Sequence, residues 1–249
     1  MHSIIDKDTE KSRYDDSAKQ ALKNGDFSSV NNLTEPLRPP YELYQSLIYR
    51  HADDGSSILE IGAGMGENTE ILLNTGAHVC AIDISEKSLS VLRKRFLDSQ
   101  LTTKVADMEK LPFDDLQFDM VVSAGSLSYG DNGVVLNEIY RVLKPEGIFI
   151  AIDSLNHNPI YRLNRYVHYL RNRRSLSTLQ RMPTLKLLEK YQLKFGEIDT
   201  TFFGSISYLS PILNKIFGEG RSAKISNRID ALVSVKRSAF KFVMVVHKT

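Results

Sequence analysis

The chain contains 249 residues, of which 42% are hydrophobic and 25% are charged, and its formal net charge is +2. This composition is typical of a globular domain with a substantial core, and the near-neutral charge gives no overall attraction to nucleic acid or to an anionic membrane. The single cysteine, Cys80, excludes an intrachain disulfide. The polar N-terminus contains no apolar signal region, and no apolar run reaches the length that spans a bilayer. We therefore expect one cytoplasmic domain without a membrane span.

The first 50 residues are expected to form an N-terminal helical cap. Residues 1–35 are polar and are predicted to be partly helical, with a break at Asn24-Gly25. A second helix is predicted to begin near Pro39 and Pro40, because proline is tolerated in the first turn of a helix.

A glycine turn follows this cap. Ser57–Ile61 is predicted to be a buried strand and Glu67–Asn74 a helix. The glycines between them are Gly62, Gly64 and Gly66, and Glu60 stands two positions before the first. Glycine permits positive φ and close approach of a ligand to the backbone, and a helix N-terminus offers N–H groups to an anion. This segment is therefore predicted to hold a ligand against the main chain.

Acidic residues follow the next two predicted strands. The strand His78–Ile82 ends at Asp83, about twenty residues past the glycines, where a carboxylate can accept the ribose hydroxyls of a nucleoside. The alternative is that Asp83 caps the next helix, although Ser85 is the better cap. Asp107 follows the strand predicted at 102–106.

Strands and helices alternate up to residue 153, which predicts an α/β fold with a doubly wound, mostly parallel sheet and helices on both faces. Ligands bind such sheets at the carboxyl ends of the strands. The glycine turn, Asp83, Asp107 and Ser123–Ser126 all fall at predicted carboxyl ends. We therefore expect one shared pocket.

Three further patterns resemble the class I S-adenosylmethionine-dependent methyltransferases. The pattern E-x-G-x-G-x-G at 60–66 resembles motif I of that family. The segment LPFDDLQFD at 111–119 resembles the connection to the fourth strand in its type 11 branch. The segment RVLKPEGIFIAID at 141–153 resembles the family's helix, turn and fifth strand, with Pro145 and Gly147 in the turn. The resemblance extends over about residues 39–153. It implies a Rossmann-like, seven-stranded sheet with an antiparallel final strand, and S-adenosyl-L-methionine as cofactor.

The resemblance also implies roles for individual residues. Asp107 would accept a hydrogen bond from the adenine amino group, Met108 would pack on the ring, and Tyr14 would fold over the cofactor. The implied cofactor-binding residues are Glu60, Gly62, Ala63, Gly64, Gly66, Asp83, Ile84, Asp107, Met108, Ser123 and Tyr14.

Two insertions, at 154–182 and 204–239, are expected to form helical lids over the site. No acidic residue occurs between Asp153 and Glu189, whereas arginine and tyrosine are frequent there. Arginine matches the geometry of phosphate and carboxylate, which predicts an anionic acceptor. The alternatives are a solvated basic helix whose tyrosines pack inward, and a nucleic-acid surface, which the modest total charge disfavours.

Methylation of a hydroxyl benefits from a general base. The candidates after the fourth and fifth strands are His157 as first choice, then Tyr129 and Asp131. The alternative for His157 is a loop side chain that caps Asn158-Pro159. Oxygen ligands for a metal could come from Asp131, Asp153 and Asn156, but their spacing does not require a metal, and none is assigned.

These features predict an S-adenosylmethionine-dependent methyltransferase that acts on a hydroxyl of a small or glycan acceptor, such as a sugar, a sugar nucleotide or a polysaccharide. Two segments, HNPIYRLNRYVHYLR at 157–171 and the region from RMPTLKLL to FGSISYL at 181–209, also resemble those of methyltransferases in bacterial surface-polysaccharide synthesis. The alternatives are a non-catalytic nucleoside-binding module or regulator on the same fold, or an RNA methyltransferase. The oligomeric state is left open, a homodimer included.

Overall fold

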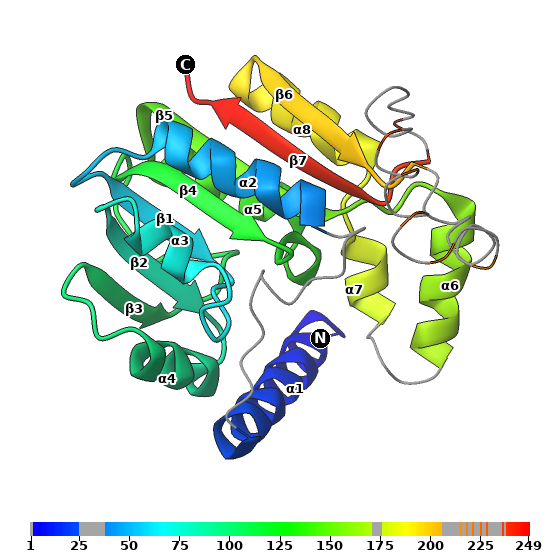
Figure 1. Ribbon diagram of the computed structural model, residues 1–249, viewed down its shortest axis with the longest axis horizontal. Coiled ribbons are helices and arrows are strands. Elements are labelled where there is room, and N and C mark those ends of the chain that lie inside the picture. Colours follow the sequence, from blue (N-terminus) through cyan, green and yellow to red (C-terminus); the bar gives the residue numbers. More distant parts are fainter. Residues whose placement is uncertain are drawn as a thin grey trace.

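The computed structural model describes residues 2–24, 38–170, 176–205 and 238–249, together with positions 215, 218, 221, 225, 228 and 236. Within this part of the chain, one seven-stranded sheet has the order β3-β2-β1-β4-β5-β7-β6. The strands are β1 (Ser57–Ile61), β2 (His78–Asp83), β3 (Leu101–Val105), β4 (Phe118–Ala124), β5 (Leu143–Ser154), β6 (Ile198–Phe203) and β7 (Lys241–His247). Strands β1 to β5 pair in parallel, whereas β7 pairs antiparallel with β5 and β6. The predicted fold class and antiparallel final strand are thus confirmed (Figure 1).

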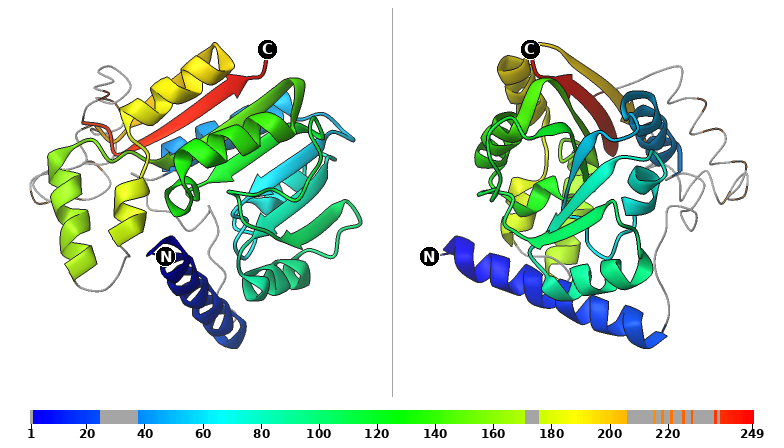
Figure 2. Two further views of the ribbon diagram at one scale, coloured as in Figure 1. Left: turned by 180° about the vertical axis from the view of Figure 1, so that it is seen from behind. Right: turned by 90° about the vertical axis from the view of Figure 1, so that its left-hand side faces the viewer.

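Helices cover both faces of the sheet and lie along the edge at the carboxyl ends of its parallel strands (Figure 1). They are α1 (His2–Asn24), α2 (Arg38–His51), α3 (Thr69–Leu73), α4 (Glu86–Arg95), the 3-10 turn η3 (Leu127–Tyr129), α5 (Asn132–Val142), α6 (Pro159–Leu170), α7 (Leu176–Arg181) and α8 (Leu185–Phe195). Tyr44 of α2 and Leu72 of α3 pack in the core on one face. Ile139 of α5 and Tyr191 of α8 pack in the core on the opposite face. The two views in Figure 2 show these layers from behind and from the side.

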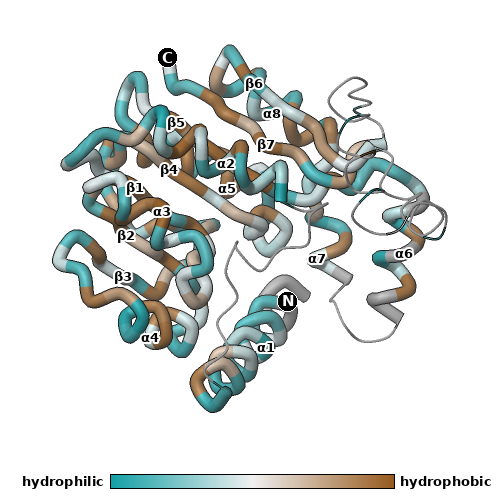
Figure 3. The backbone as a smooth tube through the Cα atoms, viewed as in Figure 1, coloured by the Kyte–Doolittle hydropathy of each residue, from teal (hydrophilic) through white to brown (hydrophobic). Residues whose placement is uncertain are grey.

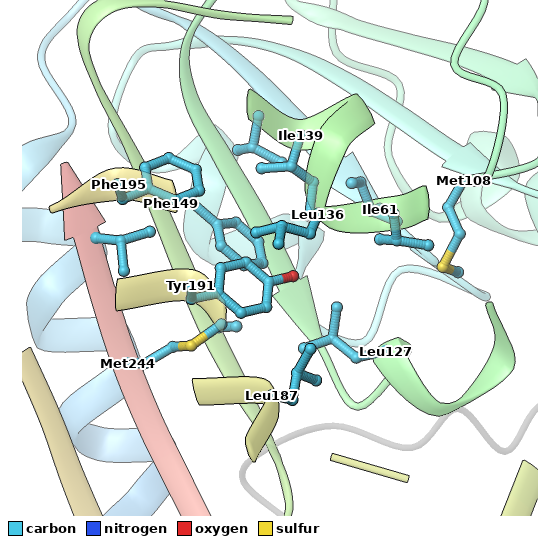
Figure 4. Packing of buried hydrophobic residues seen from close by; sticks show 14 of the residues in the cluster. Ile61, Met108, Leu127, Leu136, Ile139, Phe149, Leu187, Tyr191, Phe195 and Met244 are labelled. Carbon is cyan, nitrogen blue, oxygen red and sulfur yellow. The ribbon is translucent and has the colours of Figure 1, made fainter. Parts of the chain in front are cut away.

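The larger core lies between the sheet and helices α5 and α8 (Figure 4). Phe149 of β5 stacks on Tyr191 with ring centroids 5.5 Å apart, and Tyr191 stacks on Phe195 at 6.1 Å. These rings are buried, so apolar burial holds α8 against the sheet. Figure 3 shows hydrophobic residues concentrated on the strands, whereas α1 is largely hydrophilic. Helix α1 nevertheless buries Ala18 and Ala21, so both apolar and polar contacts hold it.

The turn before β5 differs from the prediction. The sequence places a turn at Pro145 and Gly147, whereas β5 already begins at Leu143, directly after α5. The residue with a positive φ in this turn is Glu146, at 62°. Glycine is required at 147 for a different reason, since a Cβ atom there would lie 2.8 Å from the Lys144 carbonyl oxygen. The turn is therefore built into the first residues of the strand.

Other predicted elements shift by a few residues. Helix α3 is shorter than the predicted 67–74, because residues 65–68 remain in the glycine turn. Helix α1 is described up to Asn24, so the break predicted at Asn24-Gly25 falls at the limit of the described residues and stays a prediction. The first insertion contains α6 and α7, but Arg171, Arg173 and Arg174 lie outside the described residues, as does most of 204–239. Among the helices that are described, none has the length and hydrophobicity needed to cross a membrane.

Candidate functional site

A cavity of about 400 Å³ lies at the carboxyl ends of the central strands. Ile61 ends β1, Asp83 ends β2 and Ala124 ends β4, and all three line the cavity. Helix α1 forms the opposite wall and contributes Lys7, Glu10, Tyr14 and Ser17. Figure 1 shows α1 lying across this edge of the sheet. The volume is in the range of small-molecule sites, so the strand ends and α1 enclose one binding cavity.

The glycine turn forms one side of this cavity. Gly62 and Gly64 adopt φ values of 68° and 57°, and both line the cavity with Ala63. A Cβ atom on Gly62 would lie 2.4 Å from Cβ of Ser126, so this position accepts only glycine. Gly66 also has a positive φ, of 87°, but it faces the ring of Phe96 rather than the cavity. Its implied cofactor role stays a prediction.

Asp83 connects the second strand to the glycine turn. Its Oδ2 atom accepts a hydrogen bond from Gly64 N at 3.0 Å, and its Oδ1 atom accepts one from Ser85 N at 2.8 Å. Burial raises the pKa of Asp83, while these backbone donors oppose the increase. Ser85 caps α4 by accepting from Ser88 N at 3.0 Å. Ser85 is therefore the cap, and Asp83 presents its carboxylate to the cavity beside Ile84.

Asp107 and Met108 line the cavity after β3. Asp107 Oδ1 accepts from Glu109 N at 2.9 Å, and Lys7 Nζ donates to Asp107 Oδ2 at 2.6 Å. Lys7 also pairs with Glu109 at 2.7 Å. A nucleoside amino group would thus share the Asp107 carboxylate with Lys7, a residue that sequence reasoning did not identify.

Helix α1 is fastened along the cavity by polar contacts to several elements. Besides Lys7, Arg13 donates to the Tyr129 hydroxyl at 3.2 Å, and Thr178 of α7 donates to Glu10 at 2.9 Å. Ser85 donates to Asp15 at 2.6 Å. The α1 residues that line the cavity recur at the three- and four-residue spacing of one helix face. Of these four residues, the sequence predicted a place in the site for Tyr14 and not for Lys7, Glu10 or Ser17.

Loss of the Lys7 ammonium is expected to loosen α1. In Lys7→Ala, we expect amide hydrogen exchange of α1 to accelerate about three- to tenfold, because two part-buried ion pairs are lost, while exchange in the sheet stays unchanged. Lys19→Ala is the matched control, since Lys19 pairs with Asp16 on the exposed side of the same helix. Equal acceleration in both variants would contradict a fastening role for Lys7.

The structure separates the three candidate bases. Tyr129 lines the cavity, and its ring packs edge-on to that of Tyr14 at 5.6 Å. Asp131 caps α5 by accepting from Gly133 N at 2.9 Å and does not line the cavity. His157 is exposed and lines a second cavity. The roles assigned to these residues stay predictions, but only Tyr129 faces the first cavity.

Two serines after β4 have different positions. Ser123 is buried and shares a hydrogen bond of 2.7 Å with Ser126, but it does not line the cavity. Ser126 does line it, and its hydroxyl donates to the Ile61 carbonyl oxygen at 3.0 Å. Ser123 thus holds the Ser126 hydroxyl in place by a hydrogen bond. The cofactor contact implied for Ser123 stays a prediction.

Glu60 lies behind the glycine turn rather than in the cavity wall. Its carboxyl is buried and accepts from the Thr69 hydroxyl at 2.6 Å. Burial raises the pKa of Glu60 to about 8, the negative charges of Glu67 and Asp83 add to the increase, and the Thr69 hydrogen bond opposes it. Glu60 is thus mainly protonated at pH 7 and ties β1 to the start of α3.

This raised pKa predicts a pH-dependent loss of stability. The folded state retains a proton on Glu60 that the unfolded chain releases near pH 4.5, so its contribution to stability falls as pH rises from 4.5 to about 8 and is lost above that. The slope approaches about 1.4 kcal/mol per pH unit. We expect Glu60→Gln, measured by urea unfolding across this range, to be progressively more stable relative to the native chain as pH rises. A stability difference independent of pH would contradict this ionisation.

The described residues contain no cluster of three or more histidine, cysteine, aspartate or glutamate side chains arranged to hold a metal ion. Asp153 accepts from Leu127 N at 3.1 Å, and Asn156 donates to the Leu179 carbonyl oxygen at 3.2 Å. Asn156 Oδ1 accepts from Arg165 at 3.2 Å and Asp131 caps α5, so these candidate ligand oxygens make contacts within the protein. That no metal is bound stays a prediction.

Comparison with known proteins points to the segment that contains the glycine turn, Asp83 and Asp107. A family model described as "Methyltransferase domain" matches residues 59–151. A demethylmenaquinone methyltransferase of Clavibacter sepedonicus is 42% identical over 105 residues, which cover 40% of this chain and 41% of the relative. The chain spans about two-fifths of the length of this relative and of two methyltransferase-like relatives from Schizosaccharomyces pombe.

Two solved structures share the fold over most of this chain. One is a chain from a complex that contains the Haloferax volcanii Trm112 methyltransferase activator, with 20% identity, a TM-score of 0.63, and coverage of 95% of this chain and 98% of the other. The other is phosphoethanolamine N-methyltransferase 2 of Haemonchus contortus with S-adenosyl-L-methionine, with 22% identity, a TM-score of 0.58, and coverage of 86% and 54%.

The matched residues run from β1 into β5 and include the glycine turn, Asp83 and Asp107. The family resemblance that the sequence motifs carry is thus confirmed, and the fold agrees with it. Residues 59–151 therefore carry a methyltransferase domain, and the fold around them is that of the class I S-adenosylmethionine-dependent methyltransferases.

Proposed function

We propose that the chain transfers the methyl group of S-adenosyl-L-methionine to a hydroxyl of a small or glycan acceptor. The observation that carries the proposal is the convergence of the glycine turn, Asp83 and Asp107 on one cavity. A cavity closed by α1 also suits methyl transfer, because alignment of the reactants and exclusion of water supply most of the rate enhancement.

The residues of the cavity fit the cofactor. Asp83 and Asp107 offer carboxylates to nucleoside hydroxyl and amino groups, and Met108 offers an apolar surface to the base. Asn68 Oδ1 also lines this site, is buried, and accepts no hydrogen bond from the described residues, which suits the ammonium group of a methionine moiety. When bound, the cofactor supplies a methyl group that is already activated.

We assign the proton acceptor to Tyr129 on its position, with the side chain acting as a phenolate that the Arg13 guanidinium would stabilise. Its hydroxyl accepts from Arg13 and lies at the wall of the cavity, where an acceptor hydroxyl can approach. Burial raises the pKa of the neighbouring Tyr14 well above its usual value, so Tyr14 stays protonated and can only donate or pack. His157 would have to act from the second cavity, so it is the second choice.

The acceptor class rests on the segment after β5. The named relatives act on different acceptors, a demethylmenaquinone in one case and phosphoethanolamine in the other, and the matched family segment ends at residue 151. Similarity to these relatives over the cofactor-binding segment therefore does not identify the acceptor. The lack of acidic residues between Asp153 and Glu189 supports an anionic acceptor such as a sugar nucleotide.

The test is methyl transfer from labelled cofactor to a panel of sugar nucleotides, free sugars and an RNA oligomer. We expect incorporation into a sugar nucleotide, and in Tyr129→Phe we expect a loss of about 100-fold or more in kcat with cofactor affinity retained. Tyr49→Phe is the matched control, because Tyr49 is 51% exposed on α2 and does not line the cavity.

Three other outcomes would contradict parts of this proposal. Methyl incorporation into the RNA oligomer alone would show that the acceptor is RNA and not a sugar. Unchanged turnover in Tyr129→Phe would remove Tyr129 as base and return His157 to first place. Tight cofactor binding without transfer to any acceptor would favour a nucleoside-binding module on the same fold.

A further inference from the structure

A second cavity, of about 970 Å³, lies between α6, α7 and the start of α8. It shares no lining residue with the first cavity among the residues described. Helix α7 stands between the two: Thr178 binds Glu10 at the first cavity, whereas Leu179 and Gln180 line the second. Figure 1 shows α7 between α1 and α6. The second cavity is therefore a separate compartment at the same edge of the sheet.

The charged groups in this second cavity are mainly cationic. Arg162, Arg165 and Lys186 line it, and Glu189 is the carboxylate among its described lining residues. The Arg165 side chain is buried and fixed, since it donates to the Leu155 carbonyl oxygen at 2.9 Å and lies over the ring of Phe240. Arg162 and Lys186 are exposed and can turn toward a ligand. The cavity thus has a buried positive charge at its wall and exposed positive charges at its rim.

Apolar groups stand beside these cations. Leu163 is 66% exposed and Tyr166 is 49% exposed, and both line the second cavity together with Leu185. Exposed apolar side chains grouped next to charges are typical of a binding surface rather than of a solvated helix face. An aromatic ring offers a stacking surface to a ring of the ligand.

We propose that the second cavity binds a phosphorylated ligand, with the phosphate held by Arg162, Arg165 and Lys186 and a ring of the ligand packed against Tyr166 and Leu163. Phosphate fits this arrangement better than a single carboxylate does, because a dianion can be neutralised by more than one cation and guanidinium forks bind its oxygens bidentately. The ligand's role as methyl acceptor rests on the proposed function, but its binding does not and is measured without methyl transfer.

The probe is phenyl phosphate, titrated by calorimetry into the full chain. We expect Arg162→Ala/Lys186→Ala to bind it about tenfold or more weakly, since two charge-assisted contacts are lost. Arg50→Ala/Lys190→Ala is the matched control, because both of these residues are exposed, lie outside the cavity and carry the same charge. Equal weakening in the two double variants would overturn the proposal, as would no binding to the native chain at millimolar probe.

Three further measurements test the parts of the site. Glu189→Gln is expected to tighten binding severalfold, because it removes a negative charge from the cavity. Inorganic phosphate should bind more weakly than phenyl phosphate, and Tyr166→Ala should abolish that difference. Saturation with demethylated cofactor should leave the affinity unchanged, whereas competition would place the probe in the first cavity and overturn the assignment. These results do not depend on whether methyl transfer is ever detected.

Discussion

Gly62→Ala is expected to abolish cofactor binding and to lower the free energy of unfolding by about 2–5 kcal/mol. Two effects add at this position. Alanine is strained at a φ of 68°, and its Cβ atom would lie 2.4 Å from Cβ of Ser126. The turn must therefore shift, and with it the backbone that faces the ligand. Denaturant unfolding and calorimetry with the demethylated cofactor measure the two losses.

Gly55→Ala separates the backbone strain of a positive φ from the steric contact of the new methyl group. Gly55 has a similar φ of 77°, but a Cβ atom there would meet nothing within 4 Å. We expect it to lose only about 1–2 kcal/mol and to keep cofactor affinity. The double variant Gly62→Ala/Ser126→Gly should recover part of the loss, because it removes the atom that the new methyl group meets. Equal losses at positions 55 and 62 would show that the contact with Ser126 is unimportant.

The second large effect is expected for Asp83→Asn, which should weaken cofactor binding by about 100-fold or more. The carboxylate accepts hydrogen bonds from Gly64 N and Ser85 N, and it lines the cavity where ribose hydroxyls are expected. An amide keeps the shape but turns an NH₂ group toward one of these donors. Stability should also fall, by about 1–3 kcal/mol.

Asp98→Asn is the control for Asp83→Asn. Asp98 is exposed, lies outside the cavity, and makes a similar local bond, accepting from Gln100 N at 2.8 Å. We expect no measurable change in cofactor affinity there. If Asp83→Asn bound the cofactor as tightly as the native chain, Asp83 would be a structural support of the glycine turn and not a ligand contact.

The cofactor side of the site could be predicted because its signals are local. A strand followed by glycines fixes the backbone at Gly62 and Gly64, and a carboxylate directly after a parallel strand, as at Asp83, must lie at the same sheet edge. These features depend on a few consecutive residues. The family resemblance rests on the same segments, so it indicates the cofactor and says little about the acceptor.

The acceptor side could not be predicted in the same way because it depends on tertiary arrangement. His157 and Tyr129 both follow strands of the sheet, yet they line different cavities, since α7 packs between them. Lys7 belongs to a polar helix, and no local pattern indicates that its ammonium meets Asp107, a hundred residues away. The left-handed conformation of Glu146 likewise follows from the strand geometry around it and not from its residue type.

The ion pair between Lys7 and Asp107 has a thermodynamic consequence. One carboxylate serves both the docked α1 helix and the proposed nucleoside contact. Thermodynamic linkage makes the two effects equal. If the nucleoside changes the docking equilibrium of α1 by some factor, docking of α1 changes the affinity for the nucleoside by the same factor. Ionic strength, which screens the pair, would alter both equilibria together.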